Sequence, residues 1–325
     1  MNTSSVAPQR FDNGRIGGLE RAQFRQREHC IACGSQNLKT IWTSSFDDPL
    51  VRGKISTTFY DGDPLSTLDG LSFRRSRCCD CSTTFQSDIL TDEWLKVLYG
   101  QWVSVAQVDA LESSQSQSAF WQAQENVRHC LRLQKMLRHE PVRVLDFGCG
   151  DGQFLRAANL FGFDCVGIDF SESRQTRNRH KGAVRLYSDL DELARSPDGS
   201  YFDAATLFQV LEHVAEPLAV LKNMYRWLKP GGILIVEVPD ARGVGDVPMT
   251  MEEMSYVDPL EHINQFTPES LSFIGRQAGF EPIAPASAYV ASRSTGVAKE
   301  VLKGMVWRSP LNALRKSTDQ YFRKV

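Results

Sequence analysis

The sequence of 325 residues has almost no net charge, no long apolar run and no internal repeat. Its 37 basic and 39 acidic side chains give a formal charge of −2, so no long-range field draws the chain toward nucleic acid. No apolar run reaches the length of a transmembrane helix. Residues 1–28 lack the apolar segment of a secretory signal, and we expect a flexible tail there. These absences favour a cytoplasmic protein that does not bind nucleic acid.

Eight cysteines are present, and in a reducing compartment clustered thiols more often bind metal than form disulfides. Cys30 and Cys33 form one C-x2-C pair, and Cys78 and Cys81 form another. Each pair can place two thiolates on one tight turn, and two pairs complete a tetrahedral zinc site. We therefore predict a structural Zn²⁺ on these four residues, with Cys79 outside the ligand set. The alternative is four unrelated thiols.

The residues around these pairs suit a small β module held together by metal, because its core alone would be thin. Strand-like stretches are expected at 38–42 and 55–60, and a short helix at 91–100. We expect this zinc-binding module over residues 29–100. A linker and a lead-in helix over residues 101–140 are expected to follow it.

Residues 143–154, Arg-Val-Leu-Asp-Phe-Gly-Cys-Gly-Asp-Gly-Gln-Phe, are the most informative part of the chain. An apolar strand ends in a loop with alternating glycines, and a helical pattern follows it. Glycine lets the backbone turn sharply and lie against a ligand with no Cβ in between. A second strand ends at Asp169, about twenty residues later, where a carboxylate can accept both hydroxyls of a ribose.

Two details separate this loop from a dinucleotide-binding loop. The third glycine of a G-x-G-x-x-G pattern would fall at Gln153, and an acid, Asp146, stands two residues before Gly148. A carboxylate there can hold the loop or reach an ammonium group. This arrangement resembles motif I of class I S-adenosylmethionine (SAM) dependent methyltransferases. Three later segments resemble the following motifs of that family in the same order: Val166–Ser171, Tyr201–Val214 and Leu228–Pro239.

The resemblance implies an α/β fold with a doubly wound, seven-stranded, Rossmann-like sheet, preceded here by the small zinc-bound β module. Alternating strand and helix patterns agree with it. Strands are expected near 142–147, 164–169, 183–187, 203–208 and 232–238, and helices near 120–137, 152–161, 172–180, 190–195, 217–228 and 267–279. The methyltransferase domain would cover residues 141–290. Residues 291–325 are expected to form a basic helical tail that docks on the domain or, in a second interpretation, touches an anionic membrane surface.

The resemblance also assigns the cofactor site residue by residue. It implies that SAM contacts Asp146, Gly148, Cys149, Gly150 and Gly152 in the loop, Asp169 at the ribose, Phe170, Asp189 and Leu190 near the adenine, and Phe208 near the methionyl part. Asp189 keeps a second interpretation, because a helix N-cap explains an acid at that position equally well.

Removal of a proton from the acceptor calls for a base, and histidine is the commonest one. His213 follows Glu212 at the end of the fourth predicted strand, and His262 follows Glu261 in the loop before the helix at 267–279. We predict His262 as the general base with Glu261 beside it, and His213 as the alternative. Either histidine could instead only hold its loop.

The stretch Glu261-His-Ile-Asn-Gln-Phe266 resembles a Glu-His-x-x-Tyr-Phe stretch of bacterial deoxysugar C-methyltransferases. That subgroup also has a zinc module before its methyltransferase core, and its Glu-His pair lies at the acceptor site. Pro259 and Gln265 stand where the subgroup has tyrosines. A looser version of the pattern occurs in methyltransferases of quinones and other small molecules.

We therefore expect a SAM-dependent methyltransferase whose acceptor is a small molecule, such as a sugar, a nucleotide-sugar or another secondary metabolite. An RNA methyltransferase with a zinc-ribbon reader is one alternative, against which the balanced charge argues. A SAM-binding scaffold without turnover is another. His29, His129 and His139 have no catalytic context and are expected to be solvated.

Overall fold

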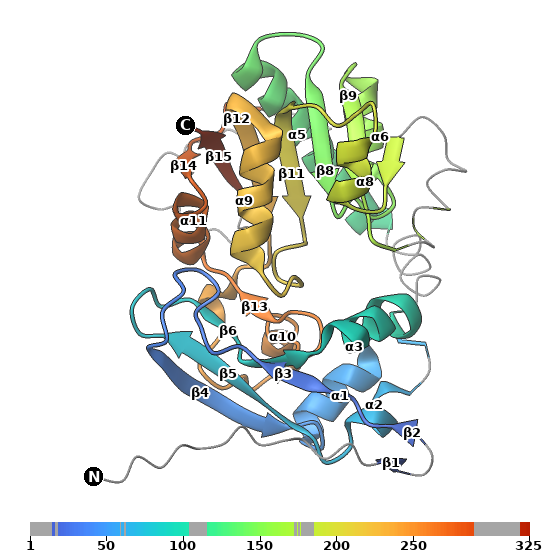
Figure 1. Cartoon of the computed structure of the whole chain (residues 1–325), viewed down its shortest axis with the longest axis vertical. Helices are drawn as coiled ribbons and strands as arrows, with labels where there is room; N and C mark the ends of the chain where they lie inside the picture. Colours follow the sequence, from blue (N-terminus) through green and yellow to red (C-terminus); the bar gives the residue numbers. More distant parts are fainter. Residues whose placement is uncertain are drawn as a thin grey trace.

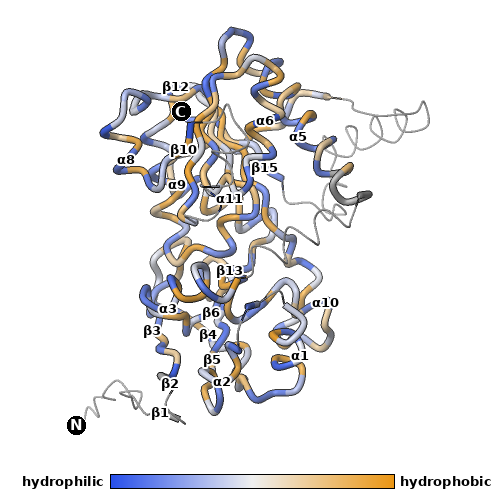
Figure 2. Tube along the Cα trace, turned by 90° about the vertical axis from the view of Figure 1, so that its right-hand side faces the viewer, coloured by the Kyte–Doolittle hydropathy of each residue, from blue (hydrophilic) through white to orange (hydrophobic). Residues whose placement is uncertain are grey.

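A computed structural model describes residues 15–16, 19–58, 60–61, 63–103, 116–171, 174, 176, 185–288 and 319–325. A large sheet with its helices lies above a smaller unit in Figure 1, and Figure 2 shows the same two parts from the side. We call the described residues from 15 to 103 the N-terminal module and the described residues from 116 onward the sheet domain. No helix among the described residues is long and apolar enough to cross a membrane.

Seven strands form the large sheet, in the order β10-β9-β8-β11-β12-β15-β14. Their bounds are β8 Arg143–Phe147, β9 Asp164–Ile168, β10 Arg185–Tyr187, β11 Phe202–Phe208, β12 Leu228–Glu237, β14 Phe280–Ile283 and β15 Gln320–Lys324. Neighbours from β10 to β12 are parallel, and β15 runs antiparallel to β12 and β14. The predicted α/β sheet of seven strands is confirmed, and the five strands that the sequence pattern predicts for this sheet are present.

The chain order reverses between β8 and β11, which are neighbours in the sheet. The first strands proceed outward through β9 to β10, and the later ones proceed the other way through β12. In open parallel sheets ligands bind at such a reversal, outside the carboxyl ends of the strands. The fold therefore predicts where a cofactor should lie.

Helices cover both faces of the sheet, as its two-sided burial requires. On one face lie α5 Ser116–Leu137 and α6 Gln153–Leu160, and on the other lie α8 Leu190–Arg195, α9 Pro217–Trp227 and α11 Pro268–Gln277. Figure 1 shows α9 crossing in front of β11 and β12. The predicted helix over 172–180 lies almost wholly outside the described residues.

The end of the chain corrects the predicted helical tail, because residues 320–324 form strand β15. Tyr321 packs into the core beneath α5 and α6, whereas Phe322 packs into the core on the opposite face. Adjacent side chains buried on opposite sides are the mark of a strand within a covered sheet. The apolar residues between 301 and 314, on which the helix was predicted, lie outside the described residues.

The N-terminal module combines short sheets with helices. Its strands are β1 Arg15–Ile16, β2 Leu19–Glu20, β3 Phe24–Gln26, β4 Leu38–Ser45, β5 Ser72–Cys78, β6 Thr84–Gln86 and β7 Asp88–Leu90. Its helices are α1 Pro49–Thr57, α2 Pro64–Leu68, α3 Asp92–Val97 and the π-helix η1 Leu98–Trp102. The β3–β7 pair corrects the flexible tail predicted for residues 1–28, since residues 24–26 are part of a sheet.

The strand predicted at 55–60 is also wrong, since helix α1 extends to Thr57. The Asp48 carboxylate accepts hydrogen bonds from the backbone nitrogens of Leu50 and Val51, with Pro49 at the first helical position. Both features favour a helix start. Val51 and Ile55 are both buried, and their spacing of four residues places them on one face of the helix.

The two parts of the molecule share a sheet. Strand β13 Asn264–Gln265, from the sheet domain, pairs with β6 of the module. Three short elements of the sheet domain lie in the same region: the 3-10 helix η2 Ala241–Gly243, α10 Met251–Met254 and β13 itself. Because β13 follows Glu261 and His262 directly, the pairing fixes the predicted acceptor loop to the module.

The buried side chain of Arg27 joins these segments. Its guanidinium donates to the carbonyl oxygens of Gln86 and Ile263, at 2.8 Å each, and to Asn264 Oδ1 at 2.7 Å. A longer bond of 3.3 Å reaches the carbonyl of Ala215. Burial lowers the pKa of Arg27 to about 9. One side chain therefore satisfies polar groups from β6, from β13 and from the loop after β11.

We expect replacement of Arg27 by Met to destabilise the fold by at least about 3 kcal/mol, because each buried acceptor left without a donor costs roughly 1–3 kcal/mol. Urea unfolding followed by circular dichroism measures the loss. Arg25 is the matched control: its side chain is 37% exposed and its ion pairs are 3.8 Å long, so Arg25→Met should change stability by less than about 1 kcal/mol. Equal losses in the two variants would contradict this role of Arg27.

Candidate functional site

The glycine loop between β8 and α6 has the backbone that the sequence predicted. Gly148, Gly150 and Gly152 have φ angles of 75°, 51° and 69°, in the left-handed region that favours glycine. A Cβ on Gly148 would lie 2.5 Å from Val210 Cγ2. The loop therefore depends on glycine for both its turn and its close packing.

Asp169 lies beside this loop at the end of β9. Its Oδ2 accepts a hydrogen bond from the Gly150 nitrogen at 2.8 Å, and its Oδ1 accepts one from the Ser171 nitrogen at 2.9 Å. The residue is buried. The structure thus brings the predicted ribose-binding carboxylate and the predicted glycine loop together at one edge of the sheet.

Asp146, buried at the reversal point, joins β8 to β11. Its Oδ1 accepts a hydrogen bond of 2.6 Å from the Thr206 hydroxyl. The pKa of Asp146 is raised to about 7, chiefly by burial; the Thr206 hydroxyl opposes the shift, and the nearby charge of Asp169 adds to it. A positively charged group bound here would favour the ionised carboxylate.

The other predicted cofactor residues lie at the carboxyl ends of the same strands. Cys149 is buried in the loop, and burial holds the pKa of its thiol well above the usual range. Phe170 follows β9 and is 65% exposed, with its ring edge-on to Phe147. Phe208 ends β11, where its ring packs against Phe154.

Asp189 and Leu190 follow β10. The Asp189 carboxylate accepts a hydrogen bond from the Glu192 nitrogen at 2.7 Å and caps α8. The helix-cap interpretation therefore accounts for this acid, while its contact with adenine stays a prediction. Leu190 is partly buried against the core.

The two Glu-His pairs, which are distant in sequence, lie side by side. The ring centroids of His213 and His262 are 5.0 Å apart. His213 Nδ1 lies 2.9 Å from the carbonyl oxygen of Glu261. One ligand-type atom from each of Glu212, His213 and His262 lies within 4.8 Å of the others. We call these three residues the Glu-His-His cluster.

Burial controls the protonation of this region. It lowers the pKa of His213 to about 3, with the neighbouring His262 adding to the effect, and it also lowers the pKa of His262. It raises the pKa of Glu212 to about 8. It raises the pKa of Glu261 to about 7, with Asp258 adding to the effect. Both imidazoles are therefore neutral at neutral pH, a state in which they can accept a proton or bind a metal ion.

The N-terminal module contributes two tyrosines that the sequence analysis missed. Tyr60 donates a hydrogen bond of 2.7 Å from its hydroxyl to Glu261 Oε1, and the Tyr99 ring lies edge-on to His213 with centroids 6.3 Å apart. Residues 98–102 form the π-helix η1, a form that often marks functional positions. No sequence pattern links Tyr60 to Glu261, 201 positions away, or Tyr99 to His213, so only the packing of the two parts reveals these tyrosines.

The four predicted zinc ligands meet at one point of the module. Cys30 Sγ and Cys81 Sγ are 3.4 Å apart, Cys33 Sγ and Cys78 Sγ are 3.6 Å apart, and all four sulfurs lie within 4.8 Å of one another. Tetrahedral zinc with Zn–S bonds of about 2.3 Å places sulfurs roughly 3.8 Å apart. The donor set therefore fits zinc, and Cys79 is exposed outside it.

A comparison with protein families identifies the domain that carries the glycine loop. A family model described as "Methyltransferase domain" matches residues 120–284, just over half of the chain. The chain belongs to this methyltransferase family. It carries a class I SAM-dependent methyltransferase domain on its α/β sheet.

The methyltransferase is 30% identical over 154 residues to the ubiquinone biosynthesis O-methyltransferase of Dinoroseobacter shibae, and 34% identical over 111 residues to that of Methylococcus capsulatus. The first alignment covers 44% of this chain and 61% of the relative, and the second covers 31% and 46%. The chain thus matches less than two thirds of the length of these relatives.

Solved structures of methyltransferases are similar to it as well. The plantazolicin methyltransferase BamL is 13% identical with a TM-score of 0.48, covering 67% of this chain and 90% of its own. The 1,6-didemethyltoxoflavin-N1-methyltransferase of Burkholderia thailandensis is 18% identical with a TM-score of 0.44, covering 76% of this chain and 97% of its own.

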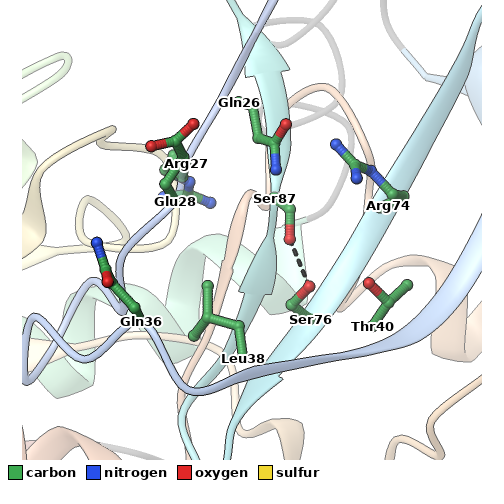
Figure 3. Close-up of a pocket in the computed structure, with 9 residues that line it drawn as sticks. All are labelled: Gln26, Arg27, Glu28, Gln36, Leu38, Thr40, Arg74, Ser76 and Ser87. Carbon is green, nitrogen blue, oxygen red and sulfur yellow. Dashed lines mark hydrogen bonds between the residues drawn. The ribbon is translucent and has the colours of Figure 1, made fainter. Parts of the chain in front are cut away.

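A cavity of about 380 Å³ in the methyltransferase lies away from these groups, in the N-terminal module (Figure 3). Its lining residues are Gln26, Arg27, Glu28, Gln36, Leu38, Thr40, Arg74, Ser76 and Ser87. Ser87 donates to Ser76 at 2.5 Å, and Arg74 binds both oxygens of Asp88 at 2.7 Å. Ser76, Ser87 and Arg74 are therefore already hydrogen-bonded within the protein. None of the predicted site residues lines the cavity, so we assign it no part in methyl transfer.

One expectation for the histidines of the methyltransferase is wrong. His129 on α5 is 1% exposed, not solvated. Its Nδ1 lies 2.5 Å from the Tyr321 hydroxyl, and its ring lies 4.9 Å from that of Phe208. The partner comes from β15, a strand that the sequence did not predict.

The raised pKa of Asp146 predicts a pH-dependent stability for the ligand-free methyltransferase. The unfolded chain releases this proton near pH 4 and the folded protein near pH 7, so ionisation should destabilise the fold as pH rises across this window. Asp146→Asn removes the ionisation and keeps an acceptor for Thr206. Urea unfolding at pH 5 and pH 8 should show the parent losing roughly 3 kcal/mol relative to the variant, because this interval covers about two of the three pKa units. Parallel pH profiles for the two proteins would contradict the assignment.

Proposed function

We propose that this protein transfers the methyl group of SAM to a small molecule held between the sheet domain and the N-terminal module. One observation carries the proposal: the glycine loop, Asp169 and the Glu212-His213 pair lie after β8, β9 and β11, where this fold binds ligands, and the Glu261-His262 pair packs against His213. SAM already carries an activated methyl group, so the protein has chiefly to position donor and acceptor and to manage one proton.

The cofactor contacts in this proposal are those that the family resemblance assigns. The glycine loop accommodates the methionyl part and the ribose, Asp169 accepts the ribose hydroxyls, and Asp146 faces the ammonium group. Phe170, with its exposed ring, covers one side of the adenine. The apo contacts of Asp169 with backbone nitrogens hold the carboxylate in place beside the loop.

The acceptor in this proposal is a small molecule with a hydroxyl or an acidic carbon, such as a sugar, a nucleotide-sugar or another secondary metabolite. The named activity of the relatives, O-methylation in ubiquinone biosynthesis, supports a small acceptor and favours this function over RNA methylation. His262 is the proposed base, with Glu261 and Tyr60 ordering the acceptor. Its neutral imidazole, due to burial, is the form that a base requires.

Replacement of Asp169 by Ala should weaken SAM binding at least tenfold, because hydrogen bonds to a charged group are worth about 1.5–3 kcal/mol each. Isothermal titration calorimetry measures the affinity, and transfer of a labelled methyl group to candidate acceptors measures activity. Asp191→Ala, an exposed acid on α8, is the control and should bind SAM as the parent does. Unchanged SAM affinity in the Asp169 variant would refute the proposed cofactor site.

We also propose that Cys30, Cys33, Cys78 and Cys81 bind one structural Zn²⁺. Cys30 and Cys78 lie in the same hydrophobic core as Phe266 of the sheet domain, so the metal would hold the module against the acceptor loop. Four thiolates close the coordination sphere and leave no position for water or substrate, which makes the role structural.

Metal analysis of protein purified without chelator should find one zinc per chain. Cys33→Ser should lose the metal and make the N-terminal module sensitive to limited proteolysis, because zinc binding contributes to the folding free energy. Cys79→Ser is the matched control and should keep both metal and protease resistance. Metal-free parent protein whose four thiols react freely would disprove the zinc site.

A further inference from the structure

We propose that the Glu-His-His cluster, Glu212, His213 and His262, binds a divalent metal ion in the acceptor site, separate from the cysteine site. The role suggested for this ion rests on the proposed methyl transfer, whereas the binding itself does not. Two imidazoles and one carboxylate with open positions are a recurrent site for divalent first-row metals.

The fold brings the three ligands together from two loops. Glu212 and His213 follow β11, and His262 precedes β13. The Asn264 nitrogen donates to the Glu212 carbonyl oxygen at 3.0 Å, which fixes one loop against the other. One ligand atom from each residue lies within 4.8 Å of the other two, a separation that one ion bonded to all three at about 2.0–2.2 Å can bridge with a small adjustment of side chains.

Glu212 is the strongest sign of a missing partner. Its side chain is 2% exposed, and neither carboxylate oxygen has a hydrogen-bond partner among the described residues. Its nearest basic atom is His213 Nε2, 3.8 Å from Oε1. A buried carboxylate without a hydrogen bond or a paired charge is strongly unfavourable. A cation bound at this position would remove that cost.

Both imidazoles are oriented as metal ligands usually are. His213 directs Nδ1 to the Glu261 carbonyl oxygen, which leaves Nε2 on the side of Glu212. His262 is hydrogen-bonded to the backbone of Ser255, and its Nδ1 has no partner among the described residues. Metal-binding histidines typically give their second nitrogen to a carbonyl or carboxylate, which fixes the tautomer and the ring.

The surroundings also favour a cation. Asp258 and Glu261 lie in the same loop as His262, and the Lys54 ammonium, 3.6 Å from Asp258, already pairs with that carboxylate. A second cation, Arg174, lowers the pKa of His213 through its charge. When ionised, the carboxylates of Glu212, Glu261 and Asp258 outnumber these two cations, so the region has an excess of negative charge that attracts a cation.

The ion would lower the pKa of an acceptor hydroxyl placed beside it. His262 is then a ligand, so metal binding replaces the base role proposed above for it. The O–H proton passes to Glu261, whose carboxylate Tyr60 orients. The acceptor oxygen forms its bond to the methyl carbon as the C–S bond breaks, and the electron pair stays on sulfur. The products are the methylated acceptor and S-adenosylhomocysteine.

Titration of the full-length, zinc-loaded protein with Mn²⁺, followed by calorimetry and electron paramagnetic resonance, tests the site. Mn²⁺ prefers nitrogen and oxygen ligands over thiolates, so it avoids the cysteine site. The parent should bind one Mn²⁺ per chain. Loss of a residue that only hydrogen-bonds to a ligand costs about 10–100-fold in metal affinity. Loss of a direct ligand should cost more, so Glu212→Gln and His262→Gln should each weaken Mn²⁺ binding by at least about 100-fold. Glu212→Gln loses no hydrogen bond, and thermal unfolding verifies its fold.

His139→Gln is the control, because His139 is 47% exposed and lies near Asp203, outside the cluster; its Mn²⁺ affinity should equal that of the parent. SAM affinity of each protein is measured in parallel. Binding of SAM without binding of Mn²⁺ overturns the metal site and leaves the proposed function standing. Binding of Mn²⁺ without binding of SAM leaves the metal site standing and overturns the proposed function. Mn²⁺ affinity that is unchanged in both Glu212→Gln and His262→Gln also overturns the proposal.

Discussion

The guanidinium of Arg27 is the constraint on which the rest of the structure depends. It is buried, and it donates to the main-chain carbonyls of Gln86 in β6, of Ile263 just before β13 and of Ala215 in the loop after β11. Asn264, which it also contacts, donates its amide to the carbonyls of Leu211 and Val214 at 2.7 Å each. These bonds tie the loop that carries His213 to the strand that follows His262. A protein interior tolerates few unpaired polar groups, so this arrangement has few alternatives.

The consequence is a site that neither part of the molecule completes alone. The cysteine knuckles, Phe85 of β6 and Phe266 of the sheet domain belong to one hydrophobic core. Helix α1 and η1 of the module pack with Met254 and Leu260 in another. Tyr60 and Tyr99 reach the Glu-His pairs because these cores hold the module in place. In this account, the proposed zinc of the module would hold the acceptor region in place without contacting the reacting groups.

Much of the sheet domain was predictable, because its signals are local. The glycines at 148, 150 and 152 specify a left-handed backbone, and the apolar runs of β8, β9 and β11 are those of strands covered on both faces. Helix α8 begins and ends where the capping and charge signals place it. The candidate cofactor residues were named from the family resemblance, and they lie in or shortly after the predicted strands. The outline of the domain follows from these local patterns.

The predictions that the structure corrects failed because contacts between distant parts of the chain decide these elements. Strand β15 is short and ends in the charged Arg323 and Lys324, and it is a strand because two cores receive Tyr321 and Phe322 on opposite sides. Residues 55–57 are helical because Asp48 and Pro49 start a helix that buries Ile55, which outweighs the β-propensity of the apolar stretch. His129 is buried by a partner on β15. The tyrosines of the acceptor region depend on the module's placement, which no pattern along the chain encodes.

The central claim is that the cofactor loop and the Glu-His pairs, together with the two tyrosines, face one common space. A crystal structure of the full chain with bound S-adenosylhomocysteine tests this most directly. The account predicts that the ribose contacts Asp169, that the ligand's amino group faces Asp146, and that its sulfur points toward His213, His262 and Tyr60. A ligand whose sulfur faces away from these side chains, or one bound in the module cavity of Figure 3, would contradict it.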